Sequence, residues 1–458
     1  AKRGKTSEDF FLAGRRIPWW AAGLSIYSTQ LSAITYLSIP AKTYATDWTR
    51  FLLQCGILAI APLVICCFLP FYRRLNLTSA YEYLEQRFSL GLRLVGSTSF
   101  VLFQLARMGI VILLPALALS AVTGLGLVWC IVLMGVLSTA YTVVGGIEAV
   151  IWTDVLQTIV LLLGAVAAIF IIIGRVDGGV GELVHVATEQ GKLRLINWEW
   201  SWTTDALGVI LIGALFTNLL PYTSDQAVVQ RYLTTPDEKQ AARAIYTNGL
   251  LAIPGSVIFF GLGTALFVFY QHNPVSLEPL AKPDQILPLF IVNEMPAGLA
   301  GLVVAGVFAA AMSSLDSSMH SIATVLTTDF VTRLRKDAGD PLVIARRLTL
   351  ALGVLGTVSA LVIATQDIKH LWDHLMGIIG LLLGALGGLF ALGIFVPRVA
   401  SLHAWCGLVA CVCSLCFVKN FTDLNGLLYG AIGTGSCFIA GCLVSVLIPR
   451  ETGDLEGL

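Results

Sequence analysis

The chain has 458 residues, of which 57% are hydrophobic and only 12% are charged. Soluble domains carry about 25% charged residues, so the composition excludes an ordinary soluble protein and predicts an all-α protein that crosses the lipid bilayer many times. The net charge of zero indicates neither a nucleic-acid partner nor an acidic tail, and the ten cysteines lack the spacing of a zinc site.

Apolar stretches of about 20 residues are the unit that spans a bilayer, and the sequence contains twelve of them. Residues 1–17 carry charge without a following apolar core or cleavage site, so they are typical of a cytoplasmic linker and not of a signal peptide. The predicted spans are 18–45, 50–72, 93–122, 124–146, 149–174, 203–230, 245–271, 299–329, 343–364, 371–397, 401–418 and 426–448.

Lysine and arginine are unevenly distributed over the loops between these spans. If residues 1–17 lie inside the cell, 19 of the 28 basic residues fall on the inner side and six on the outer side. Cytoplasmic loops carry an excess of Lys and Arg. We therefore expect the N-terminal linker on the cytoplasmic side.

Two spans are interrupted midway by polar residues or proline. They contain "LSIYSTQLSAITYLSIPAKTY" (24–44) and "LFTNLLPYTSDQAVVQRY" (215–232). Non-helical backbone at membrane depth must be buried by protein or line a cavity, and a pair of broken spans indicates an inverted-repeat transporter with a site at the midplane. Spans 1–5 would then match spans 6–10. Alternatively, the polar side chains bond back to their own helices.

The stretch "AAAMSSLDSSMHS" (309–321) places hydroxyl and carboxyl groups inside the eighth span. On a helix, Ala310, Ser313, Ser314 and Ser317 share one face, and Asp316 and His320 form an adjoining line. Oxygen ligands suit hard cations such as Na⁺. The alternative is hydrogen bonding between helices.

A buried aspartate needs a partner, and Asp154 in "GGIEAVIWTDVLQT" (145–158) is one candidate for Asp316. If spans 5 and 8 pack together, the two carboxylates converge with Ser313 and Ser317 on one cation. The alternative interpretation of Asp154 is a helix N-cap. His320 with Asp316 would alternatively form a proton relay.

Two arginines point to an anionic solute. Arg107 lies well inside the third span, and Arg50 begins the second. A guanidinium stays charged and presents a planar fork that matches a carboxylate. The alternatives are an internal salt bridge for Arg107 and snorkelling toward the outer interface for Arg50.

Five segments of the chain match a known pattern: "EDFFLAGRRIPWW" (8–20), "TSAYEYLEQRF" (78–88), "GGIEAVIWTDVLQ" (145–157), "QAVVQRYL" (226–233) and "AAAMSSLDSS" (309–318). Through these segments the chain resembles the sodium:solute symporter family. The resemblance implies a leucine-transporter-type 5+5 inverted repeat (18–174 and 203–397, joined by an extracellular loop, 175–202) and two additional C-terminal helices with a short tail (398–458). Members usually carry one more span before the first matching segment, so the first family helix is expected to be absent from this chain.

The family resemblance implies two sodium sites. In the first site, backbone carbonyls of the broken first span and hydroxyls of span 8 hold the ion. These ligand positions map to Ser28, Leu31, Ala310, Ser313 and Ser314. The second, present in some members, maps to Asp154, Ser313, Asp316 and Ser317. Asp316 stands where a hydroxyl or small residue is expected, so the second ion is Na⁺ or a proton.

Residues 34–48, together with Gln54 and Arg107, are similar to the corresponding residues of the bacterial sialic acid symporter branch. In that branch such an arginine binds the carboxylate of the sugar. The chain departs from that branch at Gln30, where a threonine is expected, and at Arg50, where relatives carry an aromatic residue. The resemblance implies Ser32, Thr35, Gln54 and Arg107 as solute-binding residues, with Asn218 as a pocket candidate at the level of the family. Gln30 and Arg50 are expected to contact the solute as well, although the chain departs from the branch at both positions.

These features predict a sodium-coupled secondary active symporter of the bacterial cytoplasmic membrane that imports sialic acid (N-acetylneuraminic acid), binds one or two Na⁺ and acts as a monomer. Another monocarboxylate, a vitamin or another sugar is the alternative solute, and protons are the alternative coupling ion. No nucleophile elbow or nucleotide loop occurs, so we expect no enzyme activity and no catalytic residues.

Overall fold

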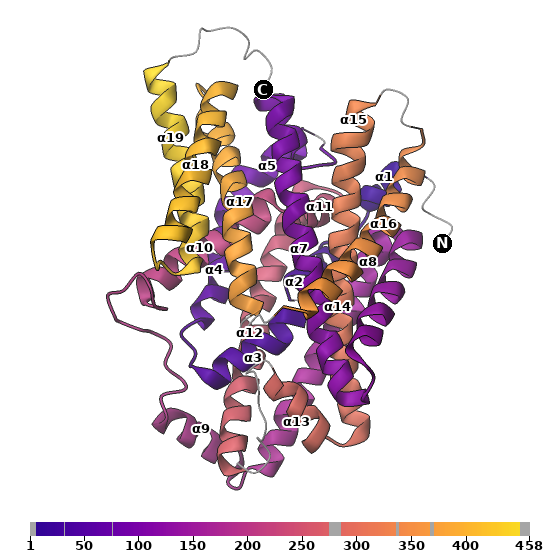
Figure 1. The fold of residues 1–458 in the computed structure, drawn as a ribbon, viewed down its shortest axis with the longest axis vertical. Coiled ribbons are helices and arrows are strands. Elements are labelled where there is room, and N and C mark those ends of the chain that lie inside the picture. The colour runs from indigo at the N-terminus through magenta and orange to yellow at the C-terminus, as the bar shows by residue number, and fades with distance from the viewer. Residues whose placement is uncertain are drawn as a thin grey trace.

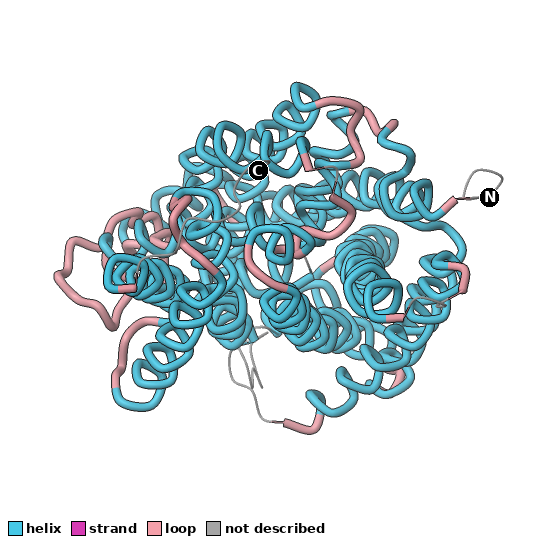
Figure 2. Tube along the Cα trace, turned by 90° about the horizontal axis from the view of Figure 1, so that it is seen from above, coloured by secondary structure: helices cyan, strands magenta, loops and turns pink. Residues whose placement is uncertain are grey.

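A computed structural model describes residues 6–31, 33–75, 77–273, 285–335, 339–366 and 371–448. Helices account for almost all of the regular structure, and the described residues contain no strand (Figure 2). Ten described helices are long and apolar enough to cross a membrane. The prediction of an all-helical, multi-pass membrane protein is confirmed.

The first half of the chain holds predicted spans 1 to 5. α1 (Ser7–Leu12) and η1 (Ala13–Arg15) precede a first span that is divided into α2 (Trp19–Gln30) and α3 (Ala33–Ala45). The second and third spans are α4 (Phe51–Leu63), η2 (Val64–Phe68) and α5 (Leu69–Arg74), then α7 (Leu90–Thr123), with the short α6 (Glu82–Arg87) between them. Spans 4 and 5 are the two arms of α8 (Leu127–Arg175).

The two arms of α8 meet at Gly146, whose φ of 60° lies in the left-handed region. A Cβ atom at this position would lie 2.9 Å from the ring of Phe10. Glycine therefore allows both the turn and the close approach of α1.

The second half repeats the broken-span design. α9 (Gly179–Glu189) leads to α10 (Leu207–Ser224) and α11 (Gln226–Leu233), which form the divided sixth span, and α12 (Glu238–His272) follows. After α13 (Ile286–Glu294) come α14 (Ala297–Val325), η5 (Leu326–Val331), α15 (Thr332–Leu334), α16 (Pro341–Ala364) and α17 (Leu371–Phe395). The chain ends with α18 (Ser401–Phe421), η6 (Gly426–Leu428) and α19 (Tyr429–Leu447).

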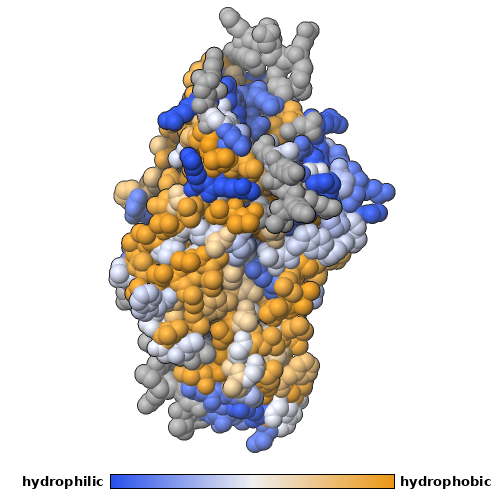
Figure 3. All heavy atoms as spheres, turned by 90° about the vertical axis from the view of Figure 1, so that its right-hand side faces the viewer, coloured by the Kyte–Doolittle hydropathy of each residue, from blue (hydrophilic) through white to orange (hydrophobic). Residues whose placement is uncertain are grey.

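α14 lies in the right-hand part of the bundle in Figure 1 and packs against α8, α7, α16 and α2. α18 and α19 pack against each other and against α17 at one side. The surface in Figure 3 carries a broad apolar band between two polar ends. This band has the form expected of a protein surrounded by lipid.

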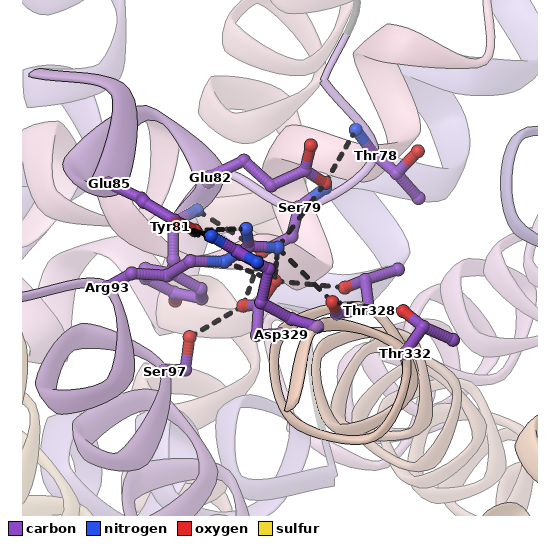
Figure 4. A network of polar contacts seen from close by, with 12 residues as sticks. Thr78, Ser79, Tyr81, Glu82, Glu85, Arg93, Ser97, Thr328, Asp329 and Thr332 are labelled. Atoms are coloured by element: carbon purple, nitrogen blue, oxygen red, sulfur yellow. Dashed lines mark hydrogen bonds and ion pairs between the residues drawn. The ribbon is translucent and has the colours of Figure 1, made fainter. Parts of the chain in front are cut away.

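A buried polar cluster ties α6, α7 and η5 together (Figure 4). The Arg93 guanidinium donates to the fully buried Asp329 carboxylate from Nη2 at 2.6 Å and to Glu85 from Nη1 at 2.7 Å. Ser79 and Ser97 donate to the other Asp329 oxygen at 2.8 and 2.6 Å. Several partners therefore compensate the cost of burying this carboxylate.

Candidate functional site

The first span breaks where the sequence predicts it. α2 ends at Gln30, the buried Leu31 leaves helical geometry with φ −83° and ψ 78°, and α3 begins at Ala33. A helix end leaves backbone carbonyls without intrahelical partners. The Thr29 carbonyl accepts a hydrogen bond from Arg107 Nη2 of α7 at 2.5 Å.

The broken end of α2 meets the serine stripe of α14. Ser28 Oγ lies 2.8 Å from Ser313 Oγ, and both side chains are buried. Ala310 and Ser314 are fully buried on the same helix, and the Ser314 hydroxyl has no hydrogen-bond partner in the described part of the chain. A buried hydroxyl without a partner is costly. A cation at this junction would supply the missing interaction.

Asp154 lies beside the same junction. Its carboxylate is fully buried and accepts hydrogen bonds from Ser313 at 2.5 Å and from Ser25 of α2. Ser313 therefore contacts residues of both predicted ion sites. Asp154 lies two turns inside the second arm of α8, which begins at Gly146, so the alternative role as a helix N-cap does not apply.

Arg231 of α11 is a site residue that the sequence analysis missed. We counted it among the basic residues of an inner loop, but its side chain is only 1% exposed and lies 3.0 Å from the Asp154 carboxylate. The guanidinium also donates to Ser25 at 2.7 Å, to the Ala227 carbonyl at 2.6 Å and to Ser317. Broken span 6 thus contributes a positive charge to the predicted second ion site.

Asp316 is fully buried on α14. Tyr141, from the first arm of α8, donates to one of its oxygens at 2.7 Å, and Ser317 Oγ lies 3.3 Å from the other. Two carboxylates and one guanidinium therefore lie together, with a formal charge of −1 when both acids are ionised. One monovalent cation would neutralise that charge.

His320 is not joined to this group by any hydrogen bond in the described residues. Its Nε2 lies 3.0 Å from the Phe10 carbonyl oxygen, and its ring packs against the rings of Phe10 and Phe11. This arrangement fixes α1 against α14. It gives no support to a proton relay between His320 and Asp316.

α7 connects the two broken spans at this depth. Gln104, one turn before Arg107, donates to Asp225 at 3.1 Å and accepts from Ser318 of α14 at 2.8 Å. Asp225 is the N-cap of α11, where it accepts from the Ala227 amide. Arg107 is 8% exposed, and no carboxylate of the described chain forms a salt bridge with it, so the internal salt bridge is not seen.

The predicted solute residues of the first span lie near the break. Asn248 of α12 lies between Gln30, 3.4 Å away, and the Tyr222 hydroxyl of α10. Thr35 donates to the Gln30 carbonyl at 3.4 Å. Ser32 lies outside the described residues.

The predicted solute residues of span 2 lie in a different setting. Arg50 is held by Asp205, with Nε to Oδ2 at 2.7 Å and Nη2 to Oδ1 at 3.2 Å. The Arg50 guanidinium, which we expected to bind the carboxylate of the solute, therefore binds the Asp205 carboxylate in a bidentate manner. The sequence analysis did not identify Asp205 as its partner. Asn218 donates to the Leu53 and Ala214 carbonyls at 2.8 Å. Gln54 lines a pocket together with Arg50, and Arg107 is not among the described residues of its lining.

Comparison with known proteins identifies the family. The model of the sodium:solute symporter family matches residues 10–410. The chain belongs to the sodium:solute symporter family. This membership confirms the resemblance found in the sequence.

Individual known proteins are similar to this chain over 89–100% of its length. It is 42% identical to the sodium/sialic acid symporter SiaT of Proteus mirabilis, over 98% of this chain and 91% of that protein. It is 41% identical to the sodium/sialic acid symporter NanT of Aliivibrio fischeri, over 100% of this chain and 91% of that protein. It is also 33% identical to the human sodium-coupled monocarboxylate transporter 1, over 89% of this chain and 67% of that protein.

Solved structures agree on the fold. The substrate-bound, outward-open structure of a Na⁺-coupled sialic acid symporter superposes with a TM-score of 0.93 at 41% identity, covering 98% of this chain and 95% of that one. The nucleobase-cation-symport-1 transporter Mhp1 superposes with a TM-score of 0.64 at 16% identity, over 97% and 96% of the two chains, and shares the fold alone. The predicted leucine-transporter-type architecture is confirmed.

Proposed function

We propose that this protein is a sodium-coupled secondary active symporter that imports sialic acid by alternating access. The contact of the broken α2 with the serine stripe of α14, where the Ser314 hydroxyl is buried without a partner, carries the ion part of this proposal. Similarity to two sodium/sialic acid symporters over nearly the whole chain supports the solute.

The first Na⁺ is held by the Ser28, Leu31 and Ala310 carbonyls and the Ser313 and Ser314 hydroxyls. Because these ligands come from both α2 and α14, the ion favours the arrangement in which the two helices are close. A ligand biases a conformational equilibrium only through its different affinities for the two states. Na⁺ binding from outside thus orders the broken helix next to the solute pocket.

The second Na⁺ is held by Asp154, Asp316 and Ser317, next to Arg231. The formal charge of −1 in this group supports one monovalent cation. Two Na⁺ imported with one sialate move one net charge, and a membrane potential of 100 mV contributes about 2.3 kcal/mol for each charge moved. Uptake at this stoichiometry is accelerated by a negative interior.

The solute carboxylate binds Arg107, which lies at the broken end of α2 beside the first ion site. Gln30, Ser32, Thr35, Gln54 and Asn218 contact the rest of the sugar in this proposal, and Arg50 stays a predicted contact at its far end. Residues 18–397 form the transport core and residues 398–458 the additional helices and tail. The protein is a monomer in the bacterial cytoplasmic membrane, with residues 1–17 in the cytoplasm.

Uptake of radiolabelled sialic acid into proteoliposomes tests the proposal. An inward Na⁺ gradient should concentrate the label above its external level, and choline in place of Na⁺ at fixed pH should abolish this. N-acetylmannosamine, which lacks the carboxylate, should not compete. Concentration driven by a proton gradient in choline would overturn sodium coupling, and equal competition by lactate would favour a general monocarboxylate transporter.

The stoichiometry is tested in the same vesicles. A potassium diffusion potential, negative inside, should accelerate uptake if two Na⁺ accompany one anion. Uptake that is indifferent to voltage would contradict the second ion.

A further inference from the structure

Exposed tryptophans gather in one short segment between α9 and α10. In the sequence "NWEWSWTTD" (197–205), Trp198 is 78% exposed, Trp200 is 90% exposed and Trp202 is 45% exposed. A group of exposed large apolar side chains is typical of a surface that binds a protein or a membrane. None of the three tryptophans is a predicted ion or solute residue, so the proposed function does not explain their exposure.

The tryptophans are carried by a closed loop. Its two ends are joined by the Leu207 amide, which donates to the Asn197 carbonyl at 2.9 Å. Within the loop, the Thr204 hydroxyl donates to Glu199 Oε2 at 3.2 Å. Closed surface loops of this kind are packed by their own side chains and are frequently functional. The loop therefore presents its tryptophans from a defined backbone.

The connection between two membrane spans fixes the level of this loop. α18 and α19 are both long and apolar enough to cross a membrane, so the residues between them, 422–425, lie at a membrane–water interface. The Asn425 amide donates to the Trp202 carbonyl at 3.0 Å, and its side chain donates to Asp205 Oδ1 at 3.0 Å. The loop thus lies at that interface, and Figure 1 shows it at the side of the bundle, near the turn between α18 and α19.

The end of α18 beside this turn has the composition of an interfacial segment. Phe417 and Phe421 are exposed on a membrane span, where they face lipid, and their rings stack 5.4 Å apart. Lys419, between them, is also exposed, and a lysine near the end of a span extends its charge toward the headgroups. Tryptophan is enriched at this level because its ring is apolar and its N–H donates a hydrogen bond.

Contacts on the other side of the loop hold it against the bundle. Lys192 Nζ donates to the Tyr44 and Thr46 carbonyls at 2.7 and 2.9 Å, at the end of α3. Arg194 forms a salt bridge of 2.7 Å with Asp47. The segment is therefore attached both to the α3–α4 turn and to the α18–α19 turn. Its tryptophans leave the interface only if these contacts break.

We propose that the loop of residues 197–207 is a membrane anchor that docks on the phospholipid interface next to the α18–α19 turn. Trp198 and Trp200 insert their rings between the headgroups and the upper acyl chains. Trp202 supports Trp200 from the loop, with the two ring centroids 5.9 Å apart in an edge-to-face contact. The loop carries two carboxylates and no cation, so apolar contact and not attraction to anionic headgroups drives the docking. The anchor does not depend on which solute or ion the protein carries.

The test uses the two tryptophans as reporters in proteoliposomes of the full chain. The emission of wild type minus that of the double variant Trp198→Phe, Trp200→Phe isolates their fluorescence. Interfacial segments bury their apolar face about 5–10 Å deep, so phosphatidylcholine brominated near the headgroup end of its acyl chains should quench this difference at least about twofold. Bromines near the chain end, and iodide in the water, should quench it weakly. Trp129→Phe removes an exposed tryptophan of the span 127–144 and is the matched lipid-facing control.

Three results would overturn the anchor. Difference emission that iodide quenches and brominated lipid does not would place the loop in water. Emission that neither agent quenches would mean that protein, such as a second copy of the chain, covers the rings. Quenching by iodide that N-acetylneuraminic acid prevents would assign the rings to a sugar.

Discussion

Replacing either partner of the Asp154–Arg231 pair should change sodium binding in opposite directions. Asp154, Asp316 and Arg231 are all at most 1% exposed, and their formal charges sum to −1. Asp154→Asn brings the sum to zero, whereas Arg231→Met brings it to −2. Because Na⁺ is attracted by the net negative charge, the first variant should bind it more weakly and the second more tightly.

Coulomb's law sets the size of both effects. Two charges 4 Å apart interact by about 4 kcal/mol at an effective dielectric constant of 20, so each variant should change Na⁺ affinity by about 100- to 1,000-fold. Breaking a buried pair that is 3.0 Å apart should also destabilise the sodium-free protein by about 3–5 kcal/mol. Arg231→Met should recover part of that loss in Na⁺, while Asp154→Asn should not.

The assay is thermal unfolding in detergent along a Na⁺ titration, with choline keeping the ionic strength constant. A ligand at 100 times its Kd stabilises the folded state by about 2.7 kcal/mol, so a 100-fold loss of affinity removes most of the shift. Asp423→Asn, an exposed carboxylate next to α18, is the control. Loss of the sodium-dependent shift in both variants, or in neither, would refute the charge argument.

Three further changes test other parts of the molecule. Arg107→Ala should weaken sialic acid binding at least about 100-fold by calorimetry, because two charge-assisted hydrogen bonds are lost, and should leave the Na⁺ titration unchanged; unaltered affinity for the acid would contradict the carboxylate site. Burial raises the pKa of Asp205, but the hydrogen bonds and charge of Arg50, the Asn425 amide and the charge of Lys42 outweigh it, so this pKa lies below its ordinary value. The pair therefore stabilises the fold above the ordinary carboxyl pKa of about 4 and loses this effect as the pH falls through the lower folded value. In thermal unfolding, the free energy of unfolding of wild type should exceed that of Asp205→Asn by about 1–2 kcal/mol. This difference should be constant from pH 8 to pH 5 and vanish in acid. A difference that grows in acid would mean that the pKa of Asp205 is shifted in the opposite direction. Asp329→Asn should lower the free energy of unfolding by about 3 kcal/mol with KM for sialic acid unchanged, and an unaltered unfolding temperature would mean that the cluster in Figure 4 contributes no stability.

Local patterns in the sequence were sufficient to locate the ion junction. The spacing of Ser313 and Ser314 fixes a shared helix face, because the helical period alone determines which side chains line up. The polar residues around Ser28 indicated the break, because such residues disfavour an uninterrupted helix in lipid. The sequence alone did not indicate whether the break and the serine face are in contact. In the structure they are, with Ser28 Oγ 2.8 Å from Ser313 Oγ.

Partners from distant segments could not be predicted in this way. Arg231 directly follows predicted span 6 and therefore looks like the first residue of a basic inner loop. Only the packing of α11 against α2 and α14 brings its side chain to Asp154. Asp205, 155 residues from Arg50, lies in a loop whose course the sequence does not indicate. Tyr141 meets Asp316 only because the first arm of α8 lies along α14. The partners in an ion pair or hydrogen bond between distant segments depend on tertiary packing. The residues that share one helix face depend only on their spacing in the sequence.

Binding of ²²Na⁺ to the purified protein, read by scintillation proximity, tests the junction of α2 and α14 most directly. Wild type should bind the ion saturably and more tightly in the presence of sialic acid, since coupling between two ligands is reciprocal. Ser314→Ala should lose this sialic-acid-dependent binding, and Ser321→Ala, whose hydroxyl donates to a carbonyl of its own helix, should retain it. Binding by Ser314→Ala that equals wild type with and without sialic acid would contradict the account.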